Sequence, residues 1–75
     1  MNPQQRDHDT AVSWINTELD ELARAVGRPN ASAAATSSIT LAFMLRVIDE
    51  DEHRAFHAQI DSIYATHNAS QATAA

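Results

Sequence analysis

The segment from Ile39 to Ile48 constrains the fold more than any other part of this sequence. Only Thr40 and Arg46 are polar within it, so on a helical wheel its apolar side chains point in nearly every direction. A helix that is apolar all round has to be buried all round. We therefore expect a buried central helix over about 31–48, capped by Asn30 and partly covered by a second copy of the chain.

A strand over residues 38–47 is the competing interpretation of the same segment, because it contains several β-favouring residues. No other segment of the sequence reads as a strand that could pair with it. The helix is therefore the favoured prediction.

An amphipathic segment precedes the central one. Its apolar residues step by three and four, which is the spacing of a helical seam and fits no strand: Val12, Ile15, Leu19, Leu22 and Val26. Asp9 or Thr10 can cap its start, and Gly27 can take the positive φ that closes a helix. We expect a helix over about 10–26.

A second amphipathic segment follows the central one. The same spacing recurs at His53, Phe56, Ile60, Ile63 and His67. Asp49 and Glu52 form a variant of the capping box at its start, and the acidic residues of the first turn suit the helix dipole. This pattern predicts a third helix over about 50–66.

The chain has 75 residues and no cysteine, so it makes one small domain that disulfides cannot stabilise. Self-association is the remaining common stabiliser. We expect an all-α homodimeric helical bundle with one domain over 9–67, a flexible arm over 1–8 and a flexible tail over 68–75. The residues expected in the core or the dimer contact are Ile39, Phe43, Met44, Val47, Phe56, Ile60 and Ile63.

The charge and hydropathy of the chain exclude several partners. The net charge is −5 and the five arginines are scattered, whereas direct binding to nucleic acid requires clustered Lys and Arg. No signal peptide and no run of eighteen strongly apolar residues is present, so we expect neither membrane binding nor export and predict a cytoplasmic protein. The lack of Lys beside abundant Arg and Ala is typical of a bacterial or phage coding sequence.

No set of nucleophile, base and orienting residue can be assembled from this sequence, so we predict neither an enzyme nor a cofactor. His53 and His57, one helical turn apart, are weak candidates for metal ligands, but no third ligand stands at fixed spacing from them. The favoured interpretation is structural: Arg54 pairs with Glu50 and His57 pairs with Asp61. His53 also offers a hypothesis of pH-sensitive assembly.

Trp14 lies beside the seam of the first helix. There it is covered by a second copy, is an anchor for an outside partner, or folds against its own N-terminal arm or the end of the third helix. Tyr64 can serve the same role, and Glu18 and Glu21 complete the candidate partner surface. We therefore predict a regulatory or adaptor protein that binds another protein as a homodimer. Two alternatives stay open: an acidic inhibitor that blocks a nucleic-acid-binding protein, and a metal or small-ligand carrier that uses His53 and His57.

Overall fold

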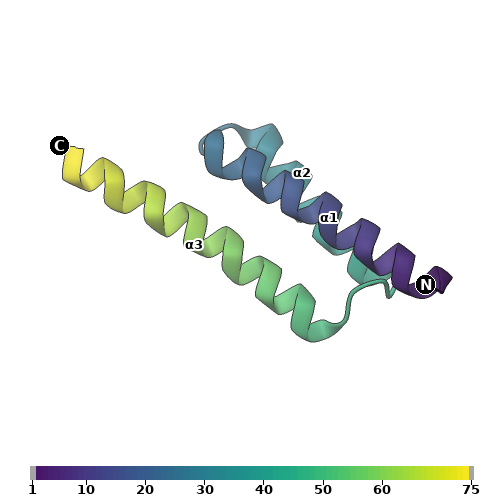
Figure 1. Ribbon diagram of the computed structural model, residues 1–75. Coiled ribbons are helices and arrows are strands. Elements are labelled where there is room, and N and C mark those ends of the chain that lie inside the picture. Colours follow the sequence, from purple (N-terminus) through teal and green to yellow (C-terminus); the bar gives the residue numbers. More distant parts are fainter. Residues whose placement is uncertain (1, 75) are drawn as a thin grey trace.

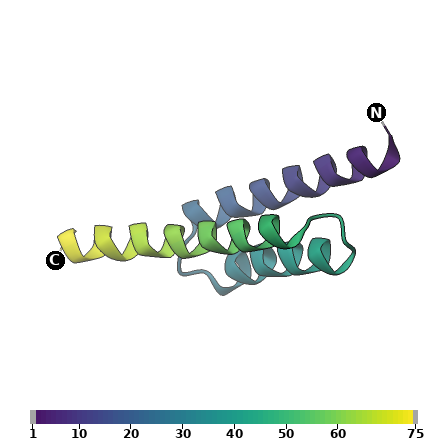
Figure 2. The same cartoon turned by 90° about the horizontal axis from the view of Figure 1, so that it is seen from below.

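A computed structural model describes residues 2–74, and in that range the chain forms three helices and no strand. Helix α1 (Pro3–Arg24) and helix α2 (Pro29–Met44) form an antiparallel hairpin, and helix α3 (Glu50–Ala74) packs against both. Figure 2 shows that the last turns of α3 extend past the α1–α2 loop, and that the first turns of α1 extend past the opposite end. The all-helical prediction is confirmed, and the strand alternative is wrong.

Helix α1 begins at Pro3, seven residues before its predicted start. Asn2 is the N-cap, and its side-chain oxygen accepts a hydrogen bond from the backbone N–H of Gln5 (2.7 Å). Pro3 then occupies the first helical position, where a missing N–H costs nothing. Residues 3–8, which were expected to form a loose arm, are therefore helical, and Asp9 and Thr10 lie inside the helix instead of capping it.

The α1–α2 connection follows the prediction at its glycine but not at its cap. Gly27 takes a φ of 101°, a conformation that only glycine adopts without strain. The predicted cap Asn30 lies inside α2. The N-cap is Arg28, whose side chain makes no capping hydrogen bond, and the helix begins with Pro29.

Helix α2 ends at Met44, four residues before its predicted end. The backbone N–H of Val47 donates to the carbonyl of Ala42 (2.9 Å), and that of Arg46 donates to Phe43 (3.0 Å). This pair of bonds is the Schellman arrangement, in which the residue after the C-cap is left-handed and is usually glycine. Here that residue is Arg46, with a φ of 60°.

The predicted capping box at the start of α3 is confirmed. The backbone N–H of Glu52 donates to Asp49 Oδ1 (2.8 Å), and the N–H of Asp49 donates to Glu52 Oε1 (3.0 Å). The predicted pair of Arg54 with Glu50 also forms, at 3.3 Å. The helix continues to Ala74, so most of the expected tail is helical; Ala75 lies outside the described residues.

The core lies where the three helices meet, and most of its members belong to the predicted seams. Its buried residues are Ile15, Leu19, Leu22, Ala35, Ile39, Ala42, Ile48, Phe56 and Ile60. Of the residues predicted for the core or the dimer contact, Ile39, Phe56 and Ile60 are therefore buried, and Val47 and Ile63 are half-buried.

The described residues contain no helix long and apolar enough to cross a membrane.

The central helix is not enclosed on all sides in the monomer, as expected for a helix that only a second copy would cover completely, and that cover by a second copy stays a prediction. Helices α1 and α3 cover the side of α2 that carries Ile39, while Leu41 is 58% exposed and Leu45, just after the helix, is 64% exposed. Met44 is 72% exposed and Phe43 is 38% exposed. Two neighbouring helices cover only part of an all-round apolar surface, so this chain presents large apolar side chains to its surroundings.

Candidate protein-docking groove

An apolar groove of about 470 Å³ runs between α1 and the C-terminal half of α2. No residue of α3 lines it, so it occupies the side of the hairpin that α3 leaves open. The side chains that dominate it are Trp14, Leu41 and Leu45, with Ala11, Ile15, Ala42 and Val47 beneath and beside them. Its polar residues are Asp7, Thr10, Ser37 and Ser38. A concave, mostly apolar surface with a few polar groups is the usual form of a binding site.

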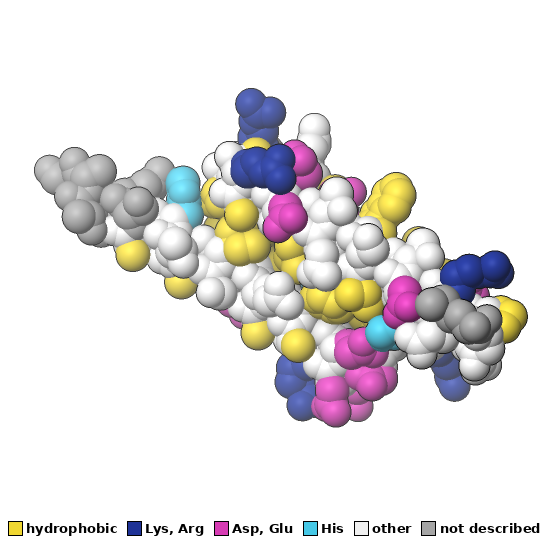
Figure 3. All heavy atoms as spheres, viewed as in Figure 1, with side chains coloured by type: hydrophobic (Ala, Val, Ile, Leu, Met, Phe, Trp, Pro, Cys, Tyr) yellow, Lys and Arg dark blue, Asp and Glu magenta, His cyan; other side chains and the backbone are white. Residues whose placement is uncertain are grey.

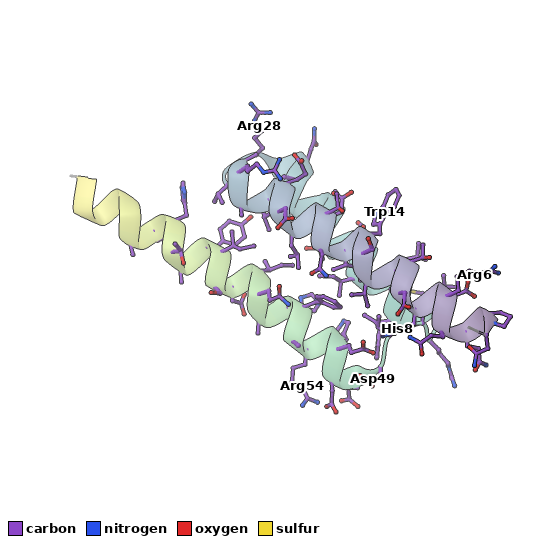
Figure 4. The ribbon with its side chains drawn as sticks, viewed as in Figure 1. Arg6, His8, Trp14, Arg28, Asp49 and Arg54 are labelled. Atoms are coloured by element: carbon purple, nitrogen blue, oxygen red, sulfur yellow. The ribbon has the colours of Figure 1, made fainter. Side chains whose placement is uncertain are left out.

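Trp14 stands at the edge of this groove in a fixed orientation. Its indole N–H donates to Ser38 Oγ (3.2 Å), and Ser38 in turn donates to the carbonyl of Ala34 (2.8 Å). Because the polar atom of the indole is satisfied inside the chain, the ring offers an apolar face that needs no further hydrogen bond. Trp14 is 63% exposed, and Figure 4 shows its side chain projecting from the side of α1 that faces away from α3.

The charged residues next to Trp14 are all acidic. Asp7 lines the groove itself, and Asp9 and Glu18 line a second hollow that also borders Trp14. Asp9 accepts a hydrogen bond from Gln5 (2.9 Å). Among the described residues, Asp7 and Glu18 have no side-chain hydrogen bond or ion pair, so no positive charge compensates their negative charges beside the groove.

The structure brings together only part of the predicted partner surface. Trp14 and Glu18 line the same hollow, whereas Glu21 lines neither the groove nor that hollow and pairs with Arg24 at 3.4 Å. Tyr64 is half-buried against the core from α3. The residues that sequence reasoning missed are Leu41 and Leu45, which were assigned to a buried helix although their spacing of four places them on one face.

The two histidines proposed as metal ligands lie in an aromatic stack. The His53 ring is 4.3 Å from the ring of Phe43 and 4.6 Å from that of His57, measured between centroids. No group of three potential metal-binding side chains exists in the described part of the chain. The predicted pair of His57 with Asp61 does not form there either; the ring of His57 packs edge-on against His53 instead.

A different histidine connects two helices. His8 Nε2 lies 2.5 Å from Glu52 Oε2, and His8 Nδ1 lies 3.3 Å from Asp9 Oδ1. The hydrogen bond with Glu52 and, secondarily, the one with Asp9 raise the pKa of His8 above its ordinary value of 6.5. Figure 4 places His8 on α1 near the start of α3, and Figure 3 shows acidic side chains gathered where α3 begins.

The comparisons with known proteins add no functional information. No protein family, no curated protein and no solved structure matches this chain. The features of this chain that bear on its function are the groove, its charges and the other exposed apolar side chains.

Proposed function

We propose that this chain is a small non-enzymatic regulatory or adaptor protein that binds another protein and acts as a homodimer. The observation that carries the proposal is the apolar groove beside α1, with Trp14, Leu41 and Leu45 each more than half exposed. Tryptophan is among the residues that most often dominate the energy of protein interfaces. An exposed apolar groove of this kind typically marks a docking site.

The groove offers enough apolar surface to support binding. Burying one large apolar side chain completely stabilises a complex by about 1.5–3 kcal/mol. Since Trp14, Leu41 and Leu45 are roughly 60% exposed, covering all three would contribute about 3–5 kcal/mol before the entropic cost of association. This is a useful share of a micromolar affinity, which corresponds to about 8 kcal/mol.

The homodimer is supported by a second surface at the end of α2, which shares only Val47 with the groove. Phe43, Met44, Arg46, Val47, Ile48, Asp49 and Glu52 line this surface. Unlike the groove, it carries both signs of charge, and the side chain of Arg46 has no ion pair within the described residues. In a two-fold contact, each residue meets the same surface of the other copy, so Arg46 of each copy can face the acidic residues of the other while Met44 is covered.

The homodimer can be tested by light scattering of the purified chain, which should give the mass of two copies. Met44→Glu should reduce the measured mass to that of one copy with unchanged helicity, because the substitution places a new negative charge in the contact between the two copies. Ser32→Glu, at a site outside both surfaces, is the control and should stay dimeric. A wild-type mass of one copy at all concentrations would remove the homodimer from the proposal.

Partner binding can be tested by affinity capture from cells that encode the chain. We expect a protein that is retained by the wild type and by the control Asn16→Ala but lost with Trp14→Ala and with Leu45→Asp. Circular dichroism should show equal helicity in all four proteins. The docking proposal fails if both groove variants stay folded and retain the same proteins as the wild type.

An inhibitor of a nucleic-acid-binding protein is the second candidate, and the acidic residues around Trp14 are the observation that favours it. The nucleic-acid-binding surface of such a target is basic. This candidate predicts that DNA or RNA competes with the chain for its captured partner. Adaptor function predicts a complex whose stability does not depend on nucleic acid.

A further inference from the structure

The position of the groove between α1 and α2 suits a helix. It lies along two antiparallel helices, and the third helix of the chain contributes nothing to it. A helix is the element that fills such a space in helical bundles. Amphipathic helices are recognised in grooves through apolar residues spaced three and four apart.

The charges beside the groove indicate the chemistry of that helix. Asp7 lies in the groove, Glu18 lies in the second hollow that borders Trp14, and neither carboxylate is paired within the described residues. No arginine lines either hollow. A second copy of the chain is disfavoured here, because it would bring the same acidic residues against each other.

We propose that the groove binds a basic amphipathic helix of another protein. The apolar residues of that helix pack between Trp14, Leu41 and Leu45, and its Lys or Arg side chains face Asp7 and Glu18. This inference rests on the proposed docking function and names the partner's chemistry. The hydrogen bond from Trp14 to Ser38 holds the indole ready for contact, so little side-chain ordering is needed on this side of the complex.

The proposal can be tested with two synthetic peptides of 14 residues. Both carry leucines at helical spacing; the other positions are Lys in one peptide and Glu in the other. Trp14 is the only tryptophan of the chain, so its fluorescence reports on the groove directly. We expect the lysine peptide to shift the emission to shorter wavelength with saturation, and the glutamate peptide to leave it unchanged.

Matched variants separate the groove from general charge attraction. Asp7→Asn with Glu18→Gln should weaken binding of the lysine peptide by roughly three- to tenfold. Asp20→Asn with Asp61→Asn, which alters the net charge equally but lines neither hollow, should leave the affinity unchanged.

Leu45→Asp should weaken binding of the lysine peptide at least tenfold. Equal binding of both peptides, or equal weakening by both double variants, would overturn the inference. A third result would also overturn it: the wild type binds neither peptide, and the dimer is dissociated by Leu45→Asp but not by Met44→Glu. The groove would then be the contact with a second copy, and the proposed homodimer would stand. A monomeric wild type that binds only the lysine peptide would support the inference and remove the homodimer.

Discussion

Replacing Arg46 by glycine should stabilise the protein, although glycine in a helix normally destabilises it. Arg46 has a φ of 60° at the position after the C-cap of α2. A non-glycine residue held in this left-handed region costs about 1–3 kcal/mol. Among the described contacts, the Arg46 side chain makes no hydrogen bond or ion pair, so its removal from the monomer costs little.

The expected gain is the relief of this strain less the entropy that glycine adds to the unfolded chain. Taking about 1–2 kcal/mol for the left-handed penalty and about 0.4–1 kcal/mol for the unfolded state, Arg46→Gly should raise the free energy of unfolding by about 0.8 kcal/mol, within a range of about 0–1.6 kcal/mol. For a domain of this size, 1 kcal/mol corresponds to about 4–8 °C in Tm.

Urea unfolding followed by circular dichroism measures the change, and it should appear as a higher midpoint with an unchanged slope. The measurement is made at a concentration where wild type and variant have the same oligomeric state, because Arg46 lies on the proposed dimer surface. Arg46→Ala is the control: it removes the side chain but keeps the left-handed penalty, so its midpoint should stay near that of the wild type.

The experiment also distinguishes two descriptions of the C-terminal end of helix α2. If residues 31–48 formed one continuous helix, as the sequence alone predicts, glycine at position 46 would destabilise it by about 1 kcal/mol. A lower midpoint for Arg46→Gly than for Arg46→Ala would therefore refute the Schellman ending described above.

The His8 ion pair, the cap of α3 and the groove can each be tested by substitution. Because its partners raise the pKa of His8, the stabilisation from His8 should be fully present near and below pH 6.5 and lost as pH rises through the folded-state pKa. His8→Ala should therefore flatten the pH dependence of the urea midpoint between pH 6 and 8.5. If the midpoint of the variant depended on pH as that of the wild type does, His8 would not be the group responsible. Glu52→Gln should keep the helix cap, since an amide can serve in the capping box. Glu52→Ala should lower the free energy of unfolding by about 1 kcal/mol more than Glu52→Gln does. Equal urea midpoints for the two variants would show that the cap contributes nothing to stability. Leu45→Asp should fold with near-wild-type helicity because the side chain is 64% exposed and the charge stays hydrated, whereas loss of helicity would place Leu45 in an obligatory contact.

The sequence predicts the number of helices and the buried faces of the first and third, because apolar spacings such as that of Ile15, Leu19 and Leu22 have one helical solution. It also predicts the capping box of Asp49 and Glu52, which depends only on residues three apart. The early start of α1 was readable in principle: Asn2 followed by Pro3 is a common signal for a helix N-terminus. The periodic apolar residues, which begin at Val12, are a more conspicuous signal and led to a predicted start at about residue 10.

The groove was not predictable in the same way, because burial of Leu41 and Leu45 depends on where α3 packs. An all-round apolar helix indicates that cover is needed but not which side the chain itself covers. The pair of His8 and Glu52 joins residues that no local pattern relates. The end of α2 was missed because its left-handed position is occupied by arginine, and the usual signal there is glycine.

Glu52 uses its two carboxylate oxygens for two different tasks, and this has a consequence for the order of folding. One oxygen closes the start of α3, and the other meets His8, which is 44 residues away along the chain. Closing a loop of that length costs about 3 kcal/mol in chain entropy beyond a constant, which is more than a solvent-accessible ion pair can offset. The apolar contacts of the helices must therefore form before His8 meets Glu52, so removal of His8 should speed unfolding and leave the folding rate almost unchanged.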